Sequence, residues 1–472
     1  MPEDDKRVEP EADEADVVAP SPPAQPKIGN AKRAASWVVV GAGASQVLRL
    51  AGNVALARLL EPEMFGLMAL VNTFLRGLNL FSDMGIGPNI VQHERGTQPT
   101  FLRTAWTLQV MRGISLWAIM MAIAWPISEF YDSPQLLPLL AFCGASAFFG
   151  GLNSPSLFLL QKKVKVGLLT LLDLSAQVLQ LIVMLIWALL SPSVWALAVG
   201  AVLSAGTKMV LSHFIKEGPR MRLQWDWKVF AELRSFGQWI FFSTAAMFLA
   251  NQTDRLVLGK LLEPQMFGVY AISAVLAAMP EQILKRIGNQ VIFPVLSHNK
   301  GLPREQLREK FLRSRRKLLV LLTPLVALGV VFGDVPIRLL YTEQYQAAGW
   351  MFPLLAAGMW LAVLGVSSSQ VPFAFGKSSY VAAGTALRFV GIAIALPVAI
   401  HYAGILGGVC VMALAEVPVY IVTQVALHRL GMRCLTQDGL YTVFFLVGGG
   451  VCLALRNAWG FTHPLQAVLW GG

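Results

Sequence analysis

Long apolar segments follow one another along almost the whole chain, and short stretches between them hold most of the charged residues. These runs include residues 37–48, 114–127, 179–190, 318–332, 350–366, 389–400 and 442–455. Segments of about 20 mainly apolar residues can cross the hydrocarbon core of a bilayer as helices. The pattern therefore predicts an all-α, polytopic membrane protein with about 12–14 transmembrane helices.

Composition supports this interpretation, because 55% of the 472 residues are hydrophobic and only 14% are charged. A soluble domain carries about a quarter of charged residues. Residues 1–33 differ from the rest: they are acidic and rich in proline, which predicts a disordered cytoplasmic tail and no signal peptide. The four cysteines show no metal-site spacing, so we expect neither a metal nor a cofactor.

The distribution of Lys and Arg predicts the orientation in the membrane. When the predicted spans are threaded alternately, most loop Lys and Arg fall on the side of the N-terminus. The positive-inside rule then places the N-terminus in the cytoplasm. The formal charge of +11 is explained by this topology and by attraction to anionic lipid headgroups, so it does not indicate nucleic-acid binding.

An octet near the start of the chain is repeated in its second half. Residues 59–66 read LLEPEMFG and residues 261–268 read LLEPQMFG, and FLRT at 101–104 matches FLRS at 311–314. Collinear matches indicate two related halves. We expect parallel lobes of six helices around a central cavity: 34–215 and 235–428, joined by a cytoplasmic linker at 216–234 and followed by additional spans at 429–472.

The octet has a local structural interpretation. Pro62 and Pro264 are suited to the first turn of a helix, and Glu61 and Glu263 directly precede them, where a negative charge is favourable. We therefore predict a tight turn between the first and second spans of each half, without a necessary contact to substrate.

The octet, together with FSDMGI at residues 81–86, resembles the polysaccharide transporter family. This family is part of the multidrug, oligosaccharidyl-lipid and polysaccharide exporter superfamily. The resemblance covers about residues 34–460. It implies a flippase of the bacterial inner membrane that moves undecaprenyl-diphosphate-linked oligosaccharides by alternating access, for O-antigen or exopolysaccharide synthesis. It also implies two six-helix lobes around a cationic cavity.

Basic and amide residues within predicted spans are the candidate substrate site. Charged groups inside a membrane are costly and generally face a cavity. Asn72, Arg76, Asn79 and Asp83 follow one another at helical spacing and share a face. The predicted cationic cavity comprises Arg49, Asn53, Asn72, Arg76, Asn79, Arg112, Lys208, Arg255 and Arg388. Arg forks suit the oxygens of a diphosphate, whereas pairing within the helix bundle for packing alone is the structural alternative.

Acidic residues within the spans are candidates for coupling transport to a proton or a sodium ion. Asp83, Asp173 and Glu416 are the three candidates, and each could equally be a salt-bridge partner. Near the cytoplasmic end of the eighth span, Glu281, Lys285 and Arg286 form a candidate gate.

Three other functions were weighed against an oligosaccharide flippase. A multidrug or cation exporter of the same superfamily would favour buried acids over buried Arg. A lipid II flippase shares the fold and is the nearest rival. A membrane polymerase or ligase would carry a large extracytoplasmic loop, which the predicted topology lacks, so we expect no enzyme. The expected partners are the lipid-linked oligosaccharide and membrane lipids, and two lobes in one chain are compatible with a monomer.

Overall fold

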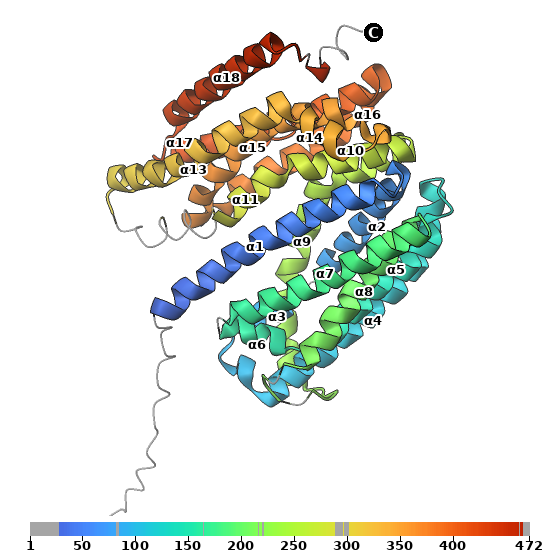
Figure 1. Ribbon diagram of the computed structural model, residues 1–472. Helices are drawn as coiled ribbons and strands as arrows, with labels where there is room; N and C mark the ends of the chain where they lie inside the picture. The colour runs from blue at the N-terminus through green and yellow to red at the C-terminus, as the bar shows by residue number, and fades with distance from the viewer. Residues whose placement is uncertain are drawn as a thin grey trace, which may run out of the picture.

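The computed structural model describes residues 28–81, 85–163, 165–215, 217–219, 221–287, 296, 302–461 and 463–465. All regular secondary structure within these ranges is helical. Most of the predicted tail lies outside the described residues, and the first helix already begins at Ile28, inside the segment predicted as tail. Figure 1 shows two groups of helices, the N-lobe and the C-lobe, with α9 running between them.

The N-lobe is built from nine helical elements. These are α1 (Ile28–Ala57), α2 (Pro62–Phe81), α3 (Ile86–Gln92), η1 (Glu94–Thr97), α4 (Pro99–Phe130), α5 (Leu136–Leu152), α6 (Ser156–Lys162), α7 (Val166–Leu190) and α8 (Val194–His213). Within it, α4 packs along α5, α5 and α7 pack on α8, and α1 packs on α7. The chain then passes through a segment at residues 214–226 to α9.

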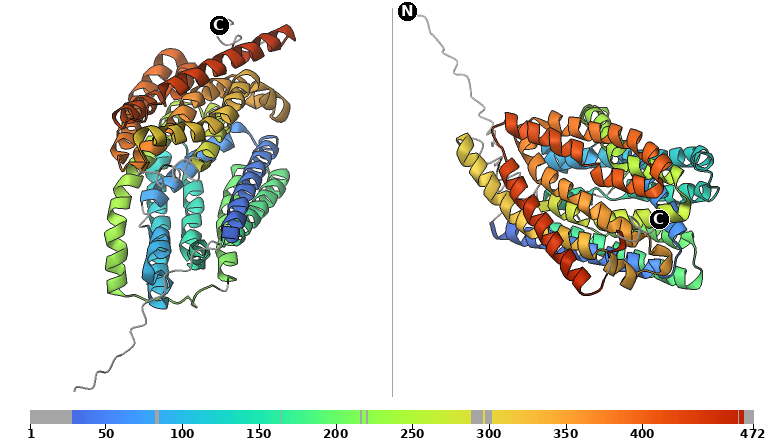
Figure 2. Two further views of the ribbon diagram at one scale, coloured as in Figure 1. Left: turned by 90° about the vertical axis from the view of Figure 1, so that its left-hand side faces the viewer. Right: turned by 90° about the horizontal axis from the view of Figure 1, so that it is seen from above.

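The C-lobe contains the remaining helices whose bounds are described. They are α9 (Trp227–Leu261), α10 (Pro264–Ala277), α11 (Met279–Ile287), α13 (Arg304–Phe332), α14 (Asp334–Leu340), η3 (Glu343–Tyr345), α15 (Ala348–Ala374), α16 (Ser378–Leu414), α17 (Val417–Arg429) and α18 (Leu435–Ala458). Helix α16 packs on α9, α15 and α17, and α13 packs on α15 and α18. Figures 1 and 2 place α18 on the outer side of this lobe, away from the N-lobe.

Length and hydropathy alone identify fewer spans than the sequence pattern predicts. Six described helices are long and apolar enough to cross a membrane, or up to eight if two bent pairs each count as one span. Four further segments are more polar or shorter: α1, α2, α9, and α10 with α11. Together with the division of α16–α17 into two spans at a kink, they bring the number to thirteen. Polar residues on α1, α2 and α9 explain part of this difference.

Several spans are interrupted at defined residues. Helices α5 and α6 meet at an angle of 60° around Asn153, and α13 and α14 also meet at 60°. Helix α16 bends at Ala403 and Gly404, where Gly404 has a φ of 56°, a left-handed value that glycine adopts without a side-chain clash.

The two octets form the predicted turns and also touch each other. Helix α2 begins at Pro62 and α10 at Pro264, and α2 packs directly on α10. The contact is backbone against backbone: a Cβ on Gly66 would lie 2.6 Å from the Pro264 carbonyl oxygen, and one on Gly268 would lie 1.7 Å from that of Pro62. Glycine is therefore required on both sides. We call this end of the molecule the octet end.

Polar contacts join the lobes at the same end. Arg58 donates hydrogen bonds to the carbonyl oxygens of Leu340 (2.8 Å) and Leu339. The Tyr345 hydroxyl donates to the Leu60 carbonyl oxygen at 3.0 Å, and the Tyr131 hydroxyl donates to that of Leu256 at 3.1 Å. Lys260 forms an ion pair with Asp132 at 2.6 Å. In this conformation the octet end is closed.

Candidate functional site

A cavity of about 420 Å³ lies between the lobes, next to the octet contact. Helices α1, α2, α7, α8, α9 and α10 supply its walls. Six polar side chains line it: Arg49, Asn53, Asn72, Arg76, Gln180 and Arg255. The structure thus brings together five of the nine residues predicted for the cationic cavity. We call this space the interlobe cavity.

Helix periodicity explains why these side chains meet. On α2, Leu67, Leu70 and Val71 are buried, whereas Asn72 and Arg76 are exposed at a spacing of four residues. One face of α2 therefore packs into the core while the other presents polar groups to the cavity. On α9, Arg255 donates a hydrogen bond to the Gln252 side chain at 3.1 Å, which orients its guanidinium group.

The three Arg residues of this cavity form no ion pair with an acid among the described residues. Within the part of the chain that the structure describes, no carboxylate lies within ion-pair distance of Arg49, Arg76 or Arg255. Arg255 is also near enough to Arg76 for their charges to repel each other. Grouping three guanidinium groups is unfavourable unless an anion binds between them. The arrangement therefore suits a ligand with several acidic oxygens, such as a diphosphate.

A second pocket, of about 530 Å³, lies inside the N-lobe. Asn79, Arg112 and Lys208 line this N-lobe pocket instead of the interlobe cavity. Arg112 donates to the Asn79 carbonyl oxygen at 2.9 Å, and Lys208 forms an ion pair with Asp173 at 2.6 Å. Lys208 is thus a compensated cation, as the packing alternative proposes.

A third cavity, of about 410 Å³, lies beside the interlobe cavity in the N-lobe. It is lined by Arg49, Asn53 and Gln180, which also line the interlobe cavity, and by Asp173, the partner of Lys208. The candidate coupling acid Asp173 is therefore close to residues of the candidate substrate site.

Arg388 and Glu416 lie together in the C-lobe, away from the walls of the interlobe cavity. The Arg388 guanidinium forms an ion pair with Glu416 at 2.7 Å. Two members of the candidate gate, Glu281 and Lys285, form an ion pair with each other at 2.5 Å on α11. Their charges also act on Glu416, so the four side chains form one cluster. Asp83 lies outside the described residues, and so does the side chain of Arg286.

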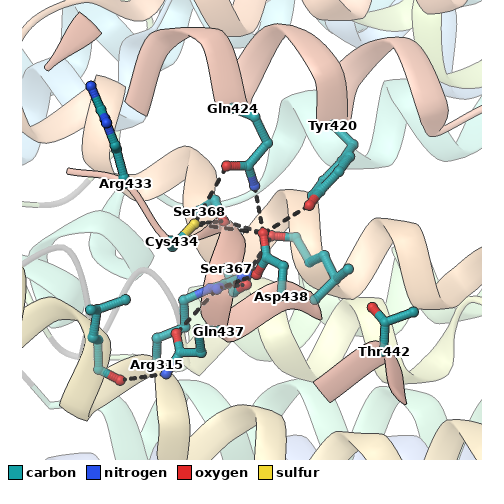
Figure 3. A network of polar contacts seen from close by, with 12 residues as sticks. Arg315, Ser367, Ser368, Tyr420, Gln424, Arg433, Cys434, Gln437, Asp438 and Thr442 are labelled. Atoms are coloured by element: carbon teal, nitrogen blue, oxygen red, sulfur yellow. Dashed lines mark hydrogen bonds and ion pairs between the residues drawn. The ribbon is translucent and has the colours of Figure 1, made fainter. Parts of the chain in front are cut away.

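Two buried ion pairs were not predicted from the sequence. The fully buried Arg315 of α13 forms an ion pair with Asp438 of α18 at 2.5 Å, and Figure 3 shows the hydrogen-bond network around them. Asp438 also accepts hydrogen bonds from Tyr420 (2.8 Å) and Gln424 (2.7 Å). At the other end of α18, Arg456 forms a bidentate pair with Asp334. Both ends of α18 are thus fixed to the C-lobe.

Comparison with known proteins identifies the family. The sequence model of the family described as "Polysaccharide biosynthesis protein" matches residues 55–349, more than half of the chain. The chain belongs to this family. The resemblance stated from the octet and the FSDMGI motif is therefore confirmed.

Three curated relatives have names that refer to polysaccharide biosynthesis. The teichuronic acid biosynthesis protein TuaB of Bacillus subtilis is 23% identical over 63% of this chain and 61% of TuaB. The amylovoran biosynthesis protein AmsL of Erwinia amylovora is 23% identical over 58% of the chain and 71% of AmsL. The lipopolysaccharide biosynthesis protein WzxC of Escherichia coli is 23% identical over 56% of the chain and 52% of WzxC. The match thus spans about half to seven tenths of each relative.

Solved structures show which fold this polysaccharide biosynthesis family member adopts. A lipid II flippase MurJ in an inward closed conformation superimposes with a TM-score of 0.71 at 14% identity, covering 91% of this chain and 94% of that one. An inward-facing multidrug resistance MATE family transporter gives 0.63 at 15% identity, covering 82% and 94%. The predicted fold, an all-helical membrane protein with two lobes, is confirmed.

Proposed function

We propose that this protein is a flippase that moves undecaprenyl-diphosphate-linked oligosaccharides across the bacterial inner membrane by alternating access. The observation that carries the proposal is the group of uncompensated cations in the interlobe cavity, Arg49, Arg76 and Arg255. Family membership supports a role in polysaccharide biosynthesis. A cavity between lobes lets a charged headgroup cross through a polar space while a prenyl chain stays in the lipid.

The charge of the cavity distinguishes the proposed substrate from a cationic drug. A cationic cargo would be repelled by three neighbouring guanidinium groups, whereas a diphosphate neutralises them. The positive-inside rule supports the orientation, with the N-terminus and the 214–226 segment in the cytoplasm and the octet end facing outwards. The closed octet end then corresponds to a conformation that does not open to the outside.

Coupling to an ion is the second part of the proposal. Asp173 and Glu416 each have a basic partner, Lys208 at 2.6 Å and Arg388 at 2.7 Å. A proton or sodium ion that occupied either carboxylate would weaken its ion pair and free the basic group. Ion binding at Asp173 would thus change the charge near the substrate region, which is the linkage that a coupled transporter requires.

The proposal is tested in a strain of the source bacterium that lacks the protein. Complementation with wild type should restore surface polysaccharide, and Arg76→Gln should reduce transport about ten- to hundredfold because a charge-assisted contact is lost. Arg76→Lys should fall between them, since it keeps the charge without the planar fork. The matched control is Arg313→Gln, because Arg313 is exposed and pairs with Glu309 on the same helix.

The readouts are surface polymer and lipid-linked oligosaccharide at the inner leaflet, with expression of each variant checked. Loss of polymer together with accumulation of the oligosaccharide lipid supports the proposal. Intact polysaccharide with increased sensitivity to cationic drugs would indicate an exporter instead. Accumulation of lipid II with arrested peptidoglycan synthesis would identify a lipid II flippase.

A further inference from the structure

Two residues that line the N-lobe pocket each carry a buried acceptor that the protein leaves unused. The side chain of Gln109 is 7% exposed, and its nitrogen donates hydrogen bonds to the carbonyl oxygens of Gly150 (3.0 Å) and Asn153 (3.4 Å). Because carbonyl oxygens only accept hydrogen bonds, these two contacts identify the nitrogen and the oxygen of the Gln109 side-chain amide. The side-chain oxygens of Gln109 and Asn153 accept no hydrogen bond from any described residue. Both residues line the pocket.

Buried acceptors without donors are uncommon in folded proteins and call for an explanation. An ionised diphosphate would not supply it, because its oxygens only accept hydrogen bonds and would be repelled by the amide oxygens. Hydroxyl groups and amide N–H groups would supply donors. These two acceptors therefore fit the sugars of the proposed substrate better than its diphosphate.

The other walls of the pocket also suit a sugar. Gly113 on α4 and Gly151 on α5 allow the two helices to touch, and a Cβ on Gly150 would meet no atom within 4 Å, so the wall is open there. Phe158 supplies an aromatic ring, a surface on which the apolar face of a sugar can stack. Arg112 and Lys208 place donors at the rim. The volume of about 530 Å³ is within the range of pockets that hold small organic ligands.

The backbone around the pocket is interrupted, as it is at many transporter binding sites. Asn153 stands where α5 ends, and α6 continues at an angle of 60°. Gly85, directly before α3, has a left-handed φ of 62°. Discontinuous helices in transporters commonly border the substrate site. The break at Asn153 also explains how its side chain reaches the pocket.

The pocket is adjacent to the proposed diphosphate site. Arg76 lines the interlobe cavity and Asn79 lines the N-lobe pocket, on the same helix α2. Three residues correspond to about 4.5 Å along a helix axis. A sugar attached to a diphosphate at Arg76 would therefore begin close to the pocket. We infer that the N-lobe pocket is the subsite for the glycan of the lipid-linked oligosaccharide, an inference that rests on the proposed function.

The test compares bound lipids with and without sugar. Full-length protein in nanodiscs is incubated with equal amounts of undecaprenyl diphosphate and of undecaprenyl-diphosphate oligosaccharides extracted from source cells that lack the protein. Native mass spectrometry gives the ratio of glycosylated to bare lipid bound. We expect the wild type to prefer the glycosylated lipid about tenfold.

Two variants change the pocket without changing its charge. Gly150→Leu fills the open wall, and Gln109→Met removes the acceptor while keeping the length of the side chain. Each should bring the ratio towards one and leave binding of the bare lipid unchanged. Gly391→Leu is the matched control, because Gly391 is also a helical glycine with no atom within 4 Å of its Cβ position and lies on α16 of the other lobe. It should keep the wild-type ratio.

The outcomes separate the subsite from the proposed function. A wild-type ratio near one, or a ratio that neither pocket variant lowers, overturns the subsite while the flippase proposal stands. If Gly150→Leu does not fold, the result for Gln109→Met decides. If the wild type binds neither lipid, the proposed function itself fails.

Discussion

The contact between the two octets makes a quantitative prediction about the transport cycle. Gly66 and Gly268 lie where the lobes touch, and the lobes must separate there for the octet end to open. A methyl group on Gly268 would lie 1.7 Å from the Pro62 carbonyl oxygen, and one on Gly66 would lie 2.6 Å from that of Pro264. Carbon–oxygen contacts in proteins are normally about 3.3 Å or longer. Gly268→Ala thus requires a displacement of roughly 1.5 Å, and Gly66→Ala a smaller one.

Overpacking of this kind costs about 1–3 kcal/mol. The cost is paid only in the conformation with the octet end closed, because the open conformation separates the two backbones. Since about 1.4 kcal/mol is a factor of ten, Gly268→Ala should shift the ratio of open to closed forms roughly 5- to 150-fold towards open. Gly66→Ala should give a smaller shift.

The assay measures access to the interlobe cavity from outside. Asn72 is replaced by Cys in a background without the four native cysteines, and a membrane-impermeant maleimide is added to spheroplasts. Labelling should increase from wild type to Gly66→Ala to Gly268→Ala. Gly448→Ala, at a helical glycine with open space around it, should not change labelling. Equal labelling of all four folded proteins would refute the idea that the octets form the outer closure.

Three further predictions concern charged groups. Arg315→Met should destabilise the protein by about 3–5 kcal/mol because it leaves the buried Asp438 without a compensating positive charge, whereas Arg315→Met with Asp438→Leu should destabilise it less; thermal unfolding in detergent compares them. Lys163 and Lys165 donate hydrogen bonds to Glu217 and lower its pKa from 4.5 to about 2, so the stabilisation from this contact is fully present above pH 4.5 and is lost as the pH falls towards 2. Hydrogen exchange of residues 214–219, corrected for intrinsic rates, should accelerate over that interval in wild type but not in Glu217→Gln. The ion pair of Asp132 is exposed, so Asp132→Ala should change the free energy of unfolding by less than about 1 kcal/mol.

Features that depend on local sequence were predictable. The octet turns follow from Pro62 and Pro264, whose rings are compatible with the first turn of a helix. The polar face of α2 follows from the spacing of Asn72 and Arg76. Both arguments need only a helix and its period, so they do not depend on what packs against the helix.

Features that join distant segments were not predictable in this way. Arg315 stands among other basic residues, a composition typical of a cytoplasmic loop, yet it is fully buried. Its partner Asp438 comes more than a hundred residues later, and helix periodicity contains no information on such a pairing. The contact of Gly66 with Pro264 is similar: the repeat indicated two equivalent turns, but their meeting depends on how the lobes pack.

The membrane-embedded basic residues fall into two classes, those with a carboxylate partner and those without one, and the two classes differ in how readily they can bind an anion. Lys208, Arg388, Arg315 and Arg456 each have a carboxylate partner. A buried pair holds helices in register, and a substrate anion could bind its cation only by displacing the carboxylate. Arg49, Arg76 and Arg255 have no such partner among the described residues and face one cavity. Their mutual repulsion decreases when an anion enters, so the free energy of substrate binding includes a contribution that no neutral ligand can provide. Under the proposed function, selectivity for a diphosphate would therefore follow from the lack of a carboxylate at ion-pair distance among the described residues as much as from the presence of Arg.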